Sequence, residues 1–149
     1  MTSMQQTALE ALVGRELTQS EIDQIDNWLP TRRDDLIADL LSIGRTKMVP
    51  TEIGAGTILA VLGGVGLSGG AFLDTLVAVG ETNRDVYWTM DLIKQGRLRI
   101  DMQATRMGLQ GLAVAVPSLA PAVTALLTLG IAADPIVADQ VSAIFNQES

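Results

Sequence analysis

Three glycines within residues 58–76 have the spacing of a dinucleotide-binding turn. Gly64, Gly66 and Gly69 spell G-x-G-x-x-G, with an apolar run before them and a helical pattern after them. In dinucleotide-binding domains such a turn joins a strand to a helix whose N-terminus faces the pyrophosphate, and an acidic residue about 20 positions later binds the ribose. Asp91, at the end of a potential second strand in "DVYWTMD", is the candidate for that residue.

The surrounding sequence favours a structural role for these glycines. Glu52 and the residues around Gly54 are typical of the first turn of a helix rather than of a strand. Thr82 and Asp85 suit a helix N-terminus, and no strand pattern that could extend a parallel sheet follows Asp91. We therefore interpret the segment as a tight joint between two packed helices and expect no cofactor. The residues expected at this helix corner or at an interaction surface are Gly63, Gly64, Gly66, Gly69, Gly70, Phe72 and Trp88.

Other residues that could carry out catalysis are few. The chain has no cysteine and no histidine, which removes disulfides, thiolate zinc sites, and the most common general base and metal ligand. Lys47 and Lys94 are the only lysines, and Tyr87 is the only tyrosine. An enzyme would have to use these residues or carboxylates. We therefore expect a non-enzymatic protein with no catalytic residue.

Two pairs of aspartates have the spacing of a shared helix face. Asp35 and Asp39 are four residues apart, and Asp23 and Asp26 are three residues apart. Such pairs could bind Ca²⁺ or Mg²⁺. No segment has the D-x-D-x-D-G spacing of a dedicated calcium loop, and positions at helix starts and on solvated faces explain the aspartates. We therefore expect no metal site.

The charge balance argues against nucleic acid as a partner. The net charge is −7, with 17 acidic and 10 basic residues, whereas binding to phosphates needs a basic surface. The one local basic cluster consists of Arg32, Arg33, Arg45 and Lys47, and Asp34 and Asp35 lie directly after its first two members. This arrangement is typical of a solvated face rather than of a phosphate site.

Start and stop signals divide the chain into about eight helices of roughly 9–15 residues. Thr18 and Glu21 form a capping box, and Pro30 ends the helix that follows it. Asp134 followed by Pro135 is a strong start signal for the last helix. The segment 98–103 is expected to be a short extended connector. Further expected helix caps are Thr51, Ser68, Thr82, Asp101 and Ser118.

These signals predict an all-α fold. We expect a compact bundle of about eight short helices with tight glycine and proline corners, forming a single helical domain over residues 1–149. No alternating strand pattern and no internal repeat is evident. The apolar segments 52–62, 68–79 and 104–129 are expected to form the core and the contact face, because helices that are apolar on most sides must be covered.

Two uncharged segments leave a membrane alternative open. No charged residue lies within 53–73 or 107–133, and each segment exceeds the roughly 18–20 apolar residues that span a bilayer. Glycines interrupt the first segment and "VPSLAP" interrupts the second, and the flanks lack clustered lysine or arginine. We favour buried helix pairs over membrane spans, with a membrane-active, holin-like protein as the alternative.

Four short patterns are spread along the chain: "GRT" at 44–46, "EIGAGTILAVLG" at 52–63, "AFLDTL" at 71–76 and "DPIVADQVSA" at 134–143. In this combination the chain resembles small acidic helical proteins encoded by tailed bacteriophages, and the resemblance covers most of its length. The resemblance implies a phage or prophage origin and a virion or accessory role. It brings no mechanism and no catalytic residue with it.

The sequence therefore predicts a phage structural or virion-associated protein that acts through protein–protein contacts. Its expected partners are other copies of itself or other virion proteins, and its expected location is the virion or the host cytoplasm. A small acidic inhibitor of a host protein is the further alternative, because an acidic surface suits that role.

Overall fold

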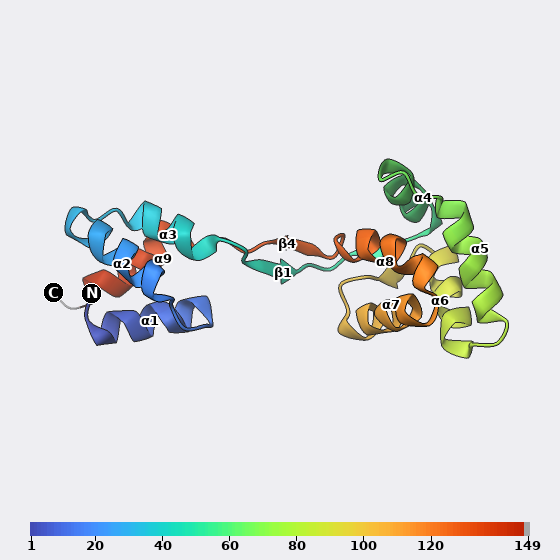
Figure 1. Ribbon diagram of the computed structural model, residues 1–149, viewed down its shortest axis with the longest axis horizontal. Helices are drawn as coiled ribbons and strands as arrows, with labels where there is room; N and C mark the ends of the chain where they lie inside the picture. Colours follow the sequence, from blue (N-terminus) through green and yellow to red (C-terminus); the bar gives the residue numbers. More distant parts are fainter. Residues whose placement is uncertain (148–149) are drawn as a thin grey trace. The chain divides into compact units, whose positions relative to one another are not determined.

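The computed structural model describes residues 1–147 and divides into two compact units (Figure 1). Unit 1 consists of Met1–Lys47 and the chain from Ala133 onward, and unit 2 consists of Met48–Ala132. Each unit has its own cluster of buried apolar side chains. That residues 1–149 form a single domain stays a prediction, and it requires the two units to unfold together.

The described chain is mostly helical, with nine α-helices and two small antiparallel sheets of two strands each. This finding corrects the all-α prediction to a mostly helical fold. The strands contain only two or three residues. Segments of that length are too short to show an alternating pattern of apolar and polar residues, so the sequence carries no clear sign of them.

Two of the four α-helices in the described part of unit 1 start with a capping box. The N–H of Glu21 donates to Oγ1 of Thr18 at 3.3 Å, and the N–H of Thr18 donates to the Glu21 carboxylate at 2.8 Å, which confirms the predicted box. Thr2 and Gln5 form the same arrangement at the start of the first helix, which is not among the helices predicted from the sequence. The helices are α1 (Ser3–Val13), α2 (Gln19–Trp28), α3 (Asp34–Ser42) and α9 (Ala138–Asn146), with a 3₁₀ turn at Leu29–Thr31.

The core of unit 1 lies between helices from both ends of the chain. α9 packs against α1 and α3, and α2 packs against α3. Each of the four helices contributes at least one fully buried apolar side chain. These include Leu9, Ile25, Ile37, Leu41 and Val141, all 0% exposed.

Arg45 joins three backbone segments of unit 1. Its guanidinium donates to the carbonyl of Val13 at 2.7 Å, and to the carbonyl and carboxylate of Asp134 at 3.2 and 3.1 Å. The prediction that Asp134 and Pro135 start the last helix is therefore wrong. The Asp134 carboxylate binds Arg45 instead of capping a helix, and α9 starts further on, at Ala138.

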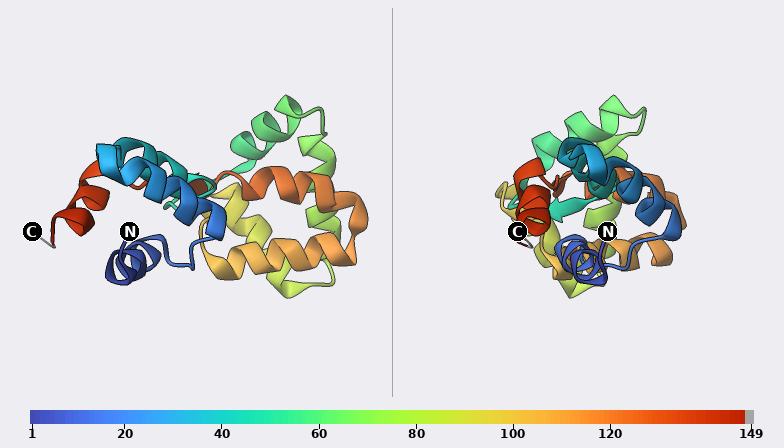
Figure 2. Two further views of the ribbon diagram at one scale, coloured as in Figure 1. Left: turned by 60° about the vertical axis from the view of Figure 1, so that its left-hand side comes forward. Right: turned by 90° about the vertical axis from the view of Figure 1, so that its left-hand side faces the viewer.

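Unit 2 contains most of the uncharged sequence. α5 packs against α4 and α6, whereas α8 packs against α4 and lies beside α7 (Figure 2). Fully buried side chains from all parts of the unit include Leu62, Leu76, Ile93, Ile100 and Leu126. The helices are α4 (Ala55–Gly64), α5 (Gly69–Gly80), α6 (Arg84–Lys94), α7 (Gln103–Ala115) and α8 (Ala120–Leu127), with a 3₁₀ turn at Pro117–Leu119.

A short sheet within unit 2 replaces some of the expected helical structure. β2 (Glu52–Ile53) pairs with β3 (Leu98–Arg99), which confirms an extended connector at the start of 98–103. Because β2 ends before α4 begins, the prediction of a helix start at Thr51 and Glu52 is wrong. Several other starts also shift, because the N-cap residues are Asn83, Met102 and Leu119 rather than Thr82, Asp101 and Ser118. Ser68 is the N-cap of α5, as predicted.

The second sheet lies where the chain passes between the units. It pairs β1 (Thr46–Met48) with β4 (Ile131–Ala133). No residue of either strand is buried. Backbone pairing rather than apolar packing therefore holds these strands together.

No helix in residues 1–147 combines the length and the apolar character needed to cross a membrane. The uncharged segment 53–73 is divided among β2, α4 and the start of α5, and 107–133 is divided among α7, α8 and β4.

Candidate interaction site

The glycine-rich segment joins helix α4 to helix α5. Gly66 has φ +77°, and the N–H of Leu67 donates to the carbonyl of Leu62 at 2.8 Å. A left-handed residue followed by an N–H that donates to the carbonyl five residues earlier is the Schellman motif, which ends many helices. Ser68 then starts α5 by accepting a hydrogen bond from the N–H of Ala71 at 3.1 Å. The prediction of a helix rather than a strand before the glycines is confirmed, so the strand of a dinucleotide-binding turn is not present here.

Gly69 permits a close approach of α5 to α4. A Cβ atom at this position would lie only 2.8 Å from the Cα of Leu59, closer than real Cβ contacts come. The neighbouring glycines differ, because a Cβ atom at Gly63, Gly64 or Gly70 would meet nothing within 4 Å. Of these four glycines, only Gly69 is therefore required by packing between the helices.

Two of the three further close approaches in unit 2, those at Gly80 and Gly54, show how helices and strands meet without any motif that signals it. A Cβ atom at Gly80 would lie 3.2 Å from the Cα of Tyr87, which brings the end of α5 against α6. A Cβ atom at Gly54 would lie 2.9 Å from the Cα of Gly96. Each neighbour is distant enough in sequence that only the fold reveals the constraint.

The two large side chains of the predicted site have different environments. Phe72 is 3% exposed and belongs to the core of unit 2. Trp88 lies on α6 and is 55% exposed. Trp88 is therefore the predicted site residue with a large exposed apolar surface, whereas Phe72 stabilises the fold.

Trp88 belongs to an ordered group of three side chains on α6, which we call the α6 cluster: Arg84, Tyr87 and Trp88. The rings of Tyr87 and Trp88 are edge-to-face, with centroids 5.2 Å apart. The guanidinium carbon of Arg84 lies 5.0 Å from the centre of the Tyr87 ring and 5.8 Å from that of Trp88. Cation–π attraction and ring contact therefore hold the three side chains together at the surface.

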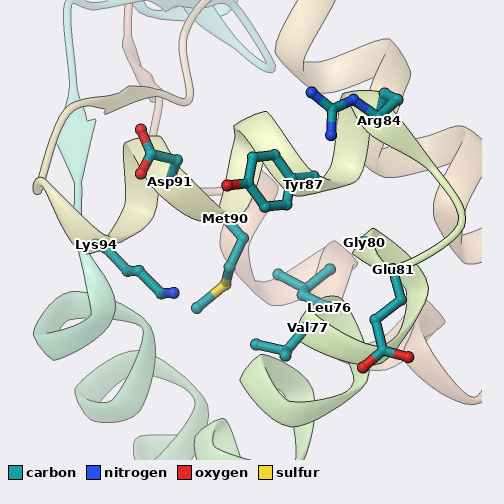
Figure 3. A pocket seen from close by; sticks show the side chains of 9 residues that line it. All are labelled: Leu76, Val77, Gly80, Glu81, Arg84, Tyr87, Met90, Asp91 and Lys94. Carbon is teal, nitrogen blue, oxygen red and sulfur yellow. The ribbon is translucent and has the colours of Figure 1, made fainter.

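A cleft of about 320 Å³ lies between α5 and α6, next to this cluster (Figure 3). Figure 3 shows the apolar side chains of Leu76, Val77 and Met90 between two charged ends. Glu81 and Arg84 lie at one end, and Asp91 and Lys94 lie at the other. We call this hollow the α5–α6 cleft; it is lined by Leu76, Val77, Gly80, Glu81, Arg84, Tyr87, Met90, Asp91 and Lys94.

The four charged residues of the cleft are not paired with one another. Six ion pairs form within residues 1–147, and none includes Glu81, Arg84, Asp91 or Lys94. Asp91 accepts a hydrogen bond from the amide of Gln95 at 2.7 Å. The cleft thus presents two positive and two negative groups that a partner could neutralise.

The carboxylates of α3 stabilise unit 1. Asp34 is 7% exposed and accepts hydrogen bonds from Arg32 at 2.8 Å and from Ser142 of α9 at 2.5 Å. These bonds, the one from Arg32 first, hold the pKa of Asp34 below its usual value. Asp35 is exposed and pairs with Arg33. Within residues 1–147, no group of three or more carboxylates lies close enough to hold a metal ion.

No protein-family model, no curated protein and no solved structure matches this chain.

Proposed function

We propose that this chain is a non-enzymatic, virion-associated protein of a bacteriophage that acts through protein–protein contacts, as a homo-oligomer or bound to other virion proteins. The α6 cluster supports this role. Tyr87 and Trp88 are 48% and 55% exposed, and tryptophan, tyrosine and arginine are the residue types that contribute most binding energy at protein interfaces. Because mutual contacts already order the three side chains, little side-chain entropy is lost when a partner binds.

Composition and sequence resemblance support the rest of the proposal. The chain has neither histidine nor cysteine, so it lacks the most common general base and the thiol nucleophile. Its net charge of −7 does not suit a nucleic-acid partner. The resemblance to small phage proteins supports a location in the virion or, before assembly, in the host cytoplasm. No cofactor is part of the proposal.

Size-exclusion chromatography with light scattering tests this proposal on the full chain. We expect an oligomer at high concentration, and we expect Trp88→Ala to shift the mass toward that of a monomer. Val114→Ala is the matched control, because Val114 is 83% exposed on α7, outside the α6 cluster. A monomer at every concentration would contradict self-association and favour an inhibitor of a host protein. Recovery only from membranes, with detergent, would favour the holin-like alternative.

A further inference from the structure

Each end of the α5–α6 cleft has one positive and one negative side chain. Glu81 and Arg84 form one end, and Asp91 and Lys94 form the other, with Tyr87 between them. On α6, residues 84, 87, 91 and 94 have the alternating three- and four-residue spacing that places side chains on one face of a helix. Along this face of α6 the order is therefore positive, aromatic, negative and positive, and Glu81, at the end of α5, lies at the same end of the cleft as Arg84.

We propose that a second copy of this chain occupies the cleft, with the two α6 helices antiparallel about a twofold axis; this contact rests on the proposed function. In a twofold interface, if residue i of the first copy faces residue j of the second, then residue j of the first copy faces residue i of the second. An axis between Tyr87 and Trp88 places Arg84 of each copy opposite Asp91 of the other.

Charge disfavours two alternative arrangements of the α6 helices. In a parallel pair of α6 helices, Arg84 would face Arg84 and Asp91 would face Asp91 of the second copy. An antiparallel pair shifted by about one turn in the direction that brings the C-terminal ends of α6 closer would place Arg84 against Lys94. Both arrangements place like charges together, and such juxtaposition suppresses wrong pairings more strongly than surface ion pairs add affinity.

The apolar centre of the contact supplies the attraction. Trp88 of each copy lies opposite Tyr87 of the other and can enter the cleft above Met90, which is 9% exposed and forms part of the apolar lining. α6 has 11 residues and is therefore only ~16 Å long, so the contact is smaller than a standard protein interface. We therefore expect a dimer that dissociates in the micromolar range.

Charge reversal tests the contact on the full chain by sedimentation velocity. Arg84→Glu places two carboxylates opposite each other, and Asp91→Arg places two guanidinium groups opposite each other. Each variant should raise the Kd of the dimer about tenfold or more. Arg97→Glu is the matched control, because this exposed arginine lies outside the cleft and should leave the Kd unchanged. Far-UV circular dichroism verifies that every variant is folded.

Mixing the two variants makes the test specific. In an equimolar mixture of R84E and D91R, the introduced glutamate of one chain faces the introduced arginine of the other, and the native Asp91 and Arg84 face each other. The dimer should therefore return in the mixture and in the double variant R84E/D91R. A mixture that stays monomeric overturns the antiparallel register.

The outcomes also separate this contact from the proposed function. A wild-type dimer that neither charge reversal weakens overturns the α6 contact but leaves self-association in place. A wild-type chain that stays monomeric overturns both the α6 contact and the proposed homo-oligomer.

Discussion

The backbone N–H of Thr51 donates a hydrogen bond to Oδ1 of Asp101 at 2.9 Å, across a sequence separation of 50 residues. Two guanidinium nitrogens of Arg99 bind the same carboxylate, at 2.8 and 2.6 Å. The Asp101 side chain is only 10% exposed. The Asp101 carboxylate therefore links Thr51, which precedes β2, to Arg99, the last residue of β3.

Asp101→Asn should destabilise unit 2. The neutral amide is a weaker acceptor for Arg99 and has one acceptor oxygen instead of two, so the bonds from Thr51 and Arg99 cannot all be kept. We expect the free energy of unfolding to fall by about 1–3 kcal/mol, measured by urea unfolding. Asp74→Asn is the control, because Asp74 is exposed on α5 and should change stability by less than about 0.5 kcal/mol. Equal stability of both variants would show that the Thr51–Asp101 bond contributes nothing.

Stability should fall in acid because several carboxylates have lowered pKa values. The hydrogen bond from Arg15 is the main cause that lowers the pKa of Glu21 from 4.5 to about 2. The bonds from Arg99 and then Thr51 lower the pKa of Asp101. A carboxyl group whose pKa is lower in the folded state stabilises the protein above its unfolded pKa, and this contribution disappears as the pH falls through the folded pKa.

Calorimetry measures the predicted acid dependence. The Tm should decrease as the pH is lowered from about 4.5 to about 2, the window set by Glu21. D101N should show a shallower decrease than the wild type, because one of the linked carboxyl groups is gone. A Tm that is constant or rises over this window would contradict the role of these carboxylates.

Gly69→Ala should destabilise the α4–α5 pair. The new methyl group would lie 2.8 Å from the Cα of Leu59, so the two helix backbones would have to separate. We expect a loss of about 1–3 kcal/mol in thermal or urea unfolding. Gly70→Ala is the matched control, because its methyl group would meet nothing within 4 Å, and alanine favours a helix over glycine by up to about 1 kcal/mol. Equal stability of the two variants would show that the close approach of α5 to α4 at Gly69 does not affect folding stability.

Two core substitutions test whether residues 1–149 behave as one domain. Leu41 and Leu126 are 0% and 1% exposed, in the cores of unit 1 and unit 2, and aspartate at either position buries an unpaired charge. Leu41→Asp should unfold unit 1 and leave unit 2 intact, because Met48–Ala132 is continuous and has its own core. Leu126→Asp should unfold unit 2 and weaken unit 1, whose two segments would then be joined by a long unfolded loop.

Hydrogen exchange distinguishes these outcomes residue by residue. Protected amides that remain in α5 and α6 of L41D would show that unit 2 folds independently. Loss of protection throughout the chain in both variants would instead support one cooperative domain over residues 1–149.

Local interactions in this chain could be predicted from the sequence, whereas long-range ones could not. The capping box of Thr18 and Glu21 and the cap at Ser68 involve neighbours within three residues, so their spacing identifies them. Asp134 also has a helix-start spacing, but Arg45, far away in the sequence, binds its carboxylate. A local sequence pattern does not show that a residue far away in the chain binds the same side chain.

The candidate site shows the same division. The sequence identifies Trp88 as a residue that could anchor a partner, and it does not identify the charged ends of the cleft. The three- and four-residue spacing of Arg84, Tyr87, Asp91 and Lys94 is present in the sequence. Only the packing of α5 against α6, with Gly80 close to Tyr87, shows that these residues line one hollow.

Sedimentation equilibrium of the wild-type full chain tests the central claim, that two copies of this protein associate through α6. We predict an average mass that rises from that of a monomer toward that of a dimer as concentration increases. Added salt should weaken the dimer, because it screens the charges at the ends of the cleft. A monomer mass at every concentration, at low and at high salt, would contradict the account.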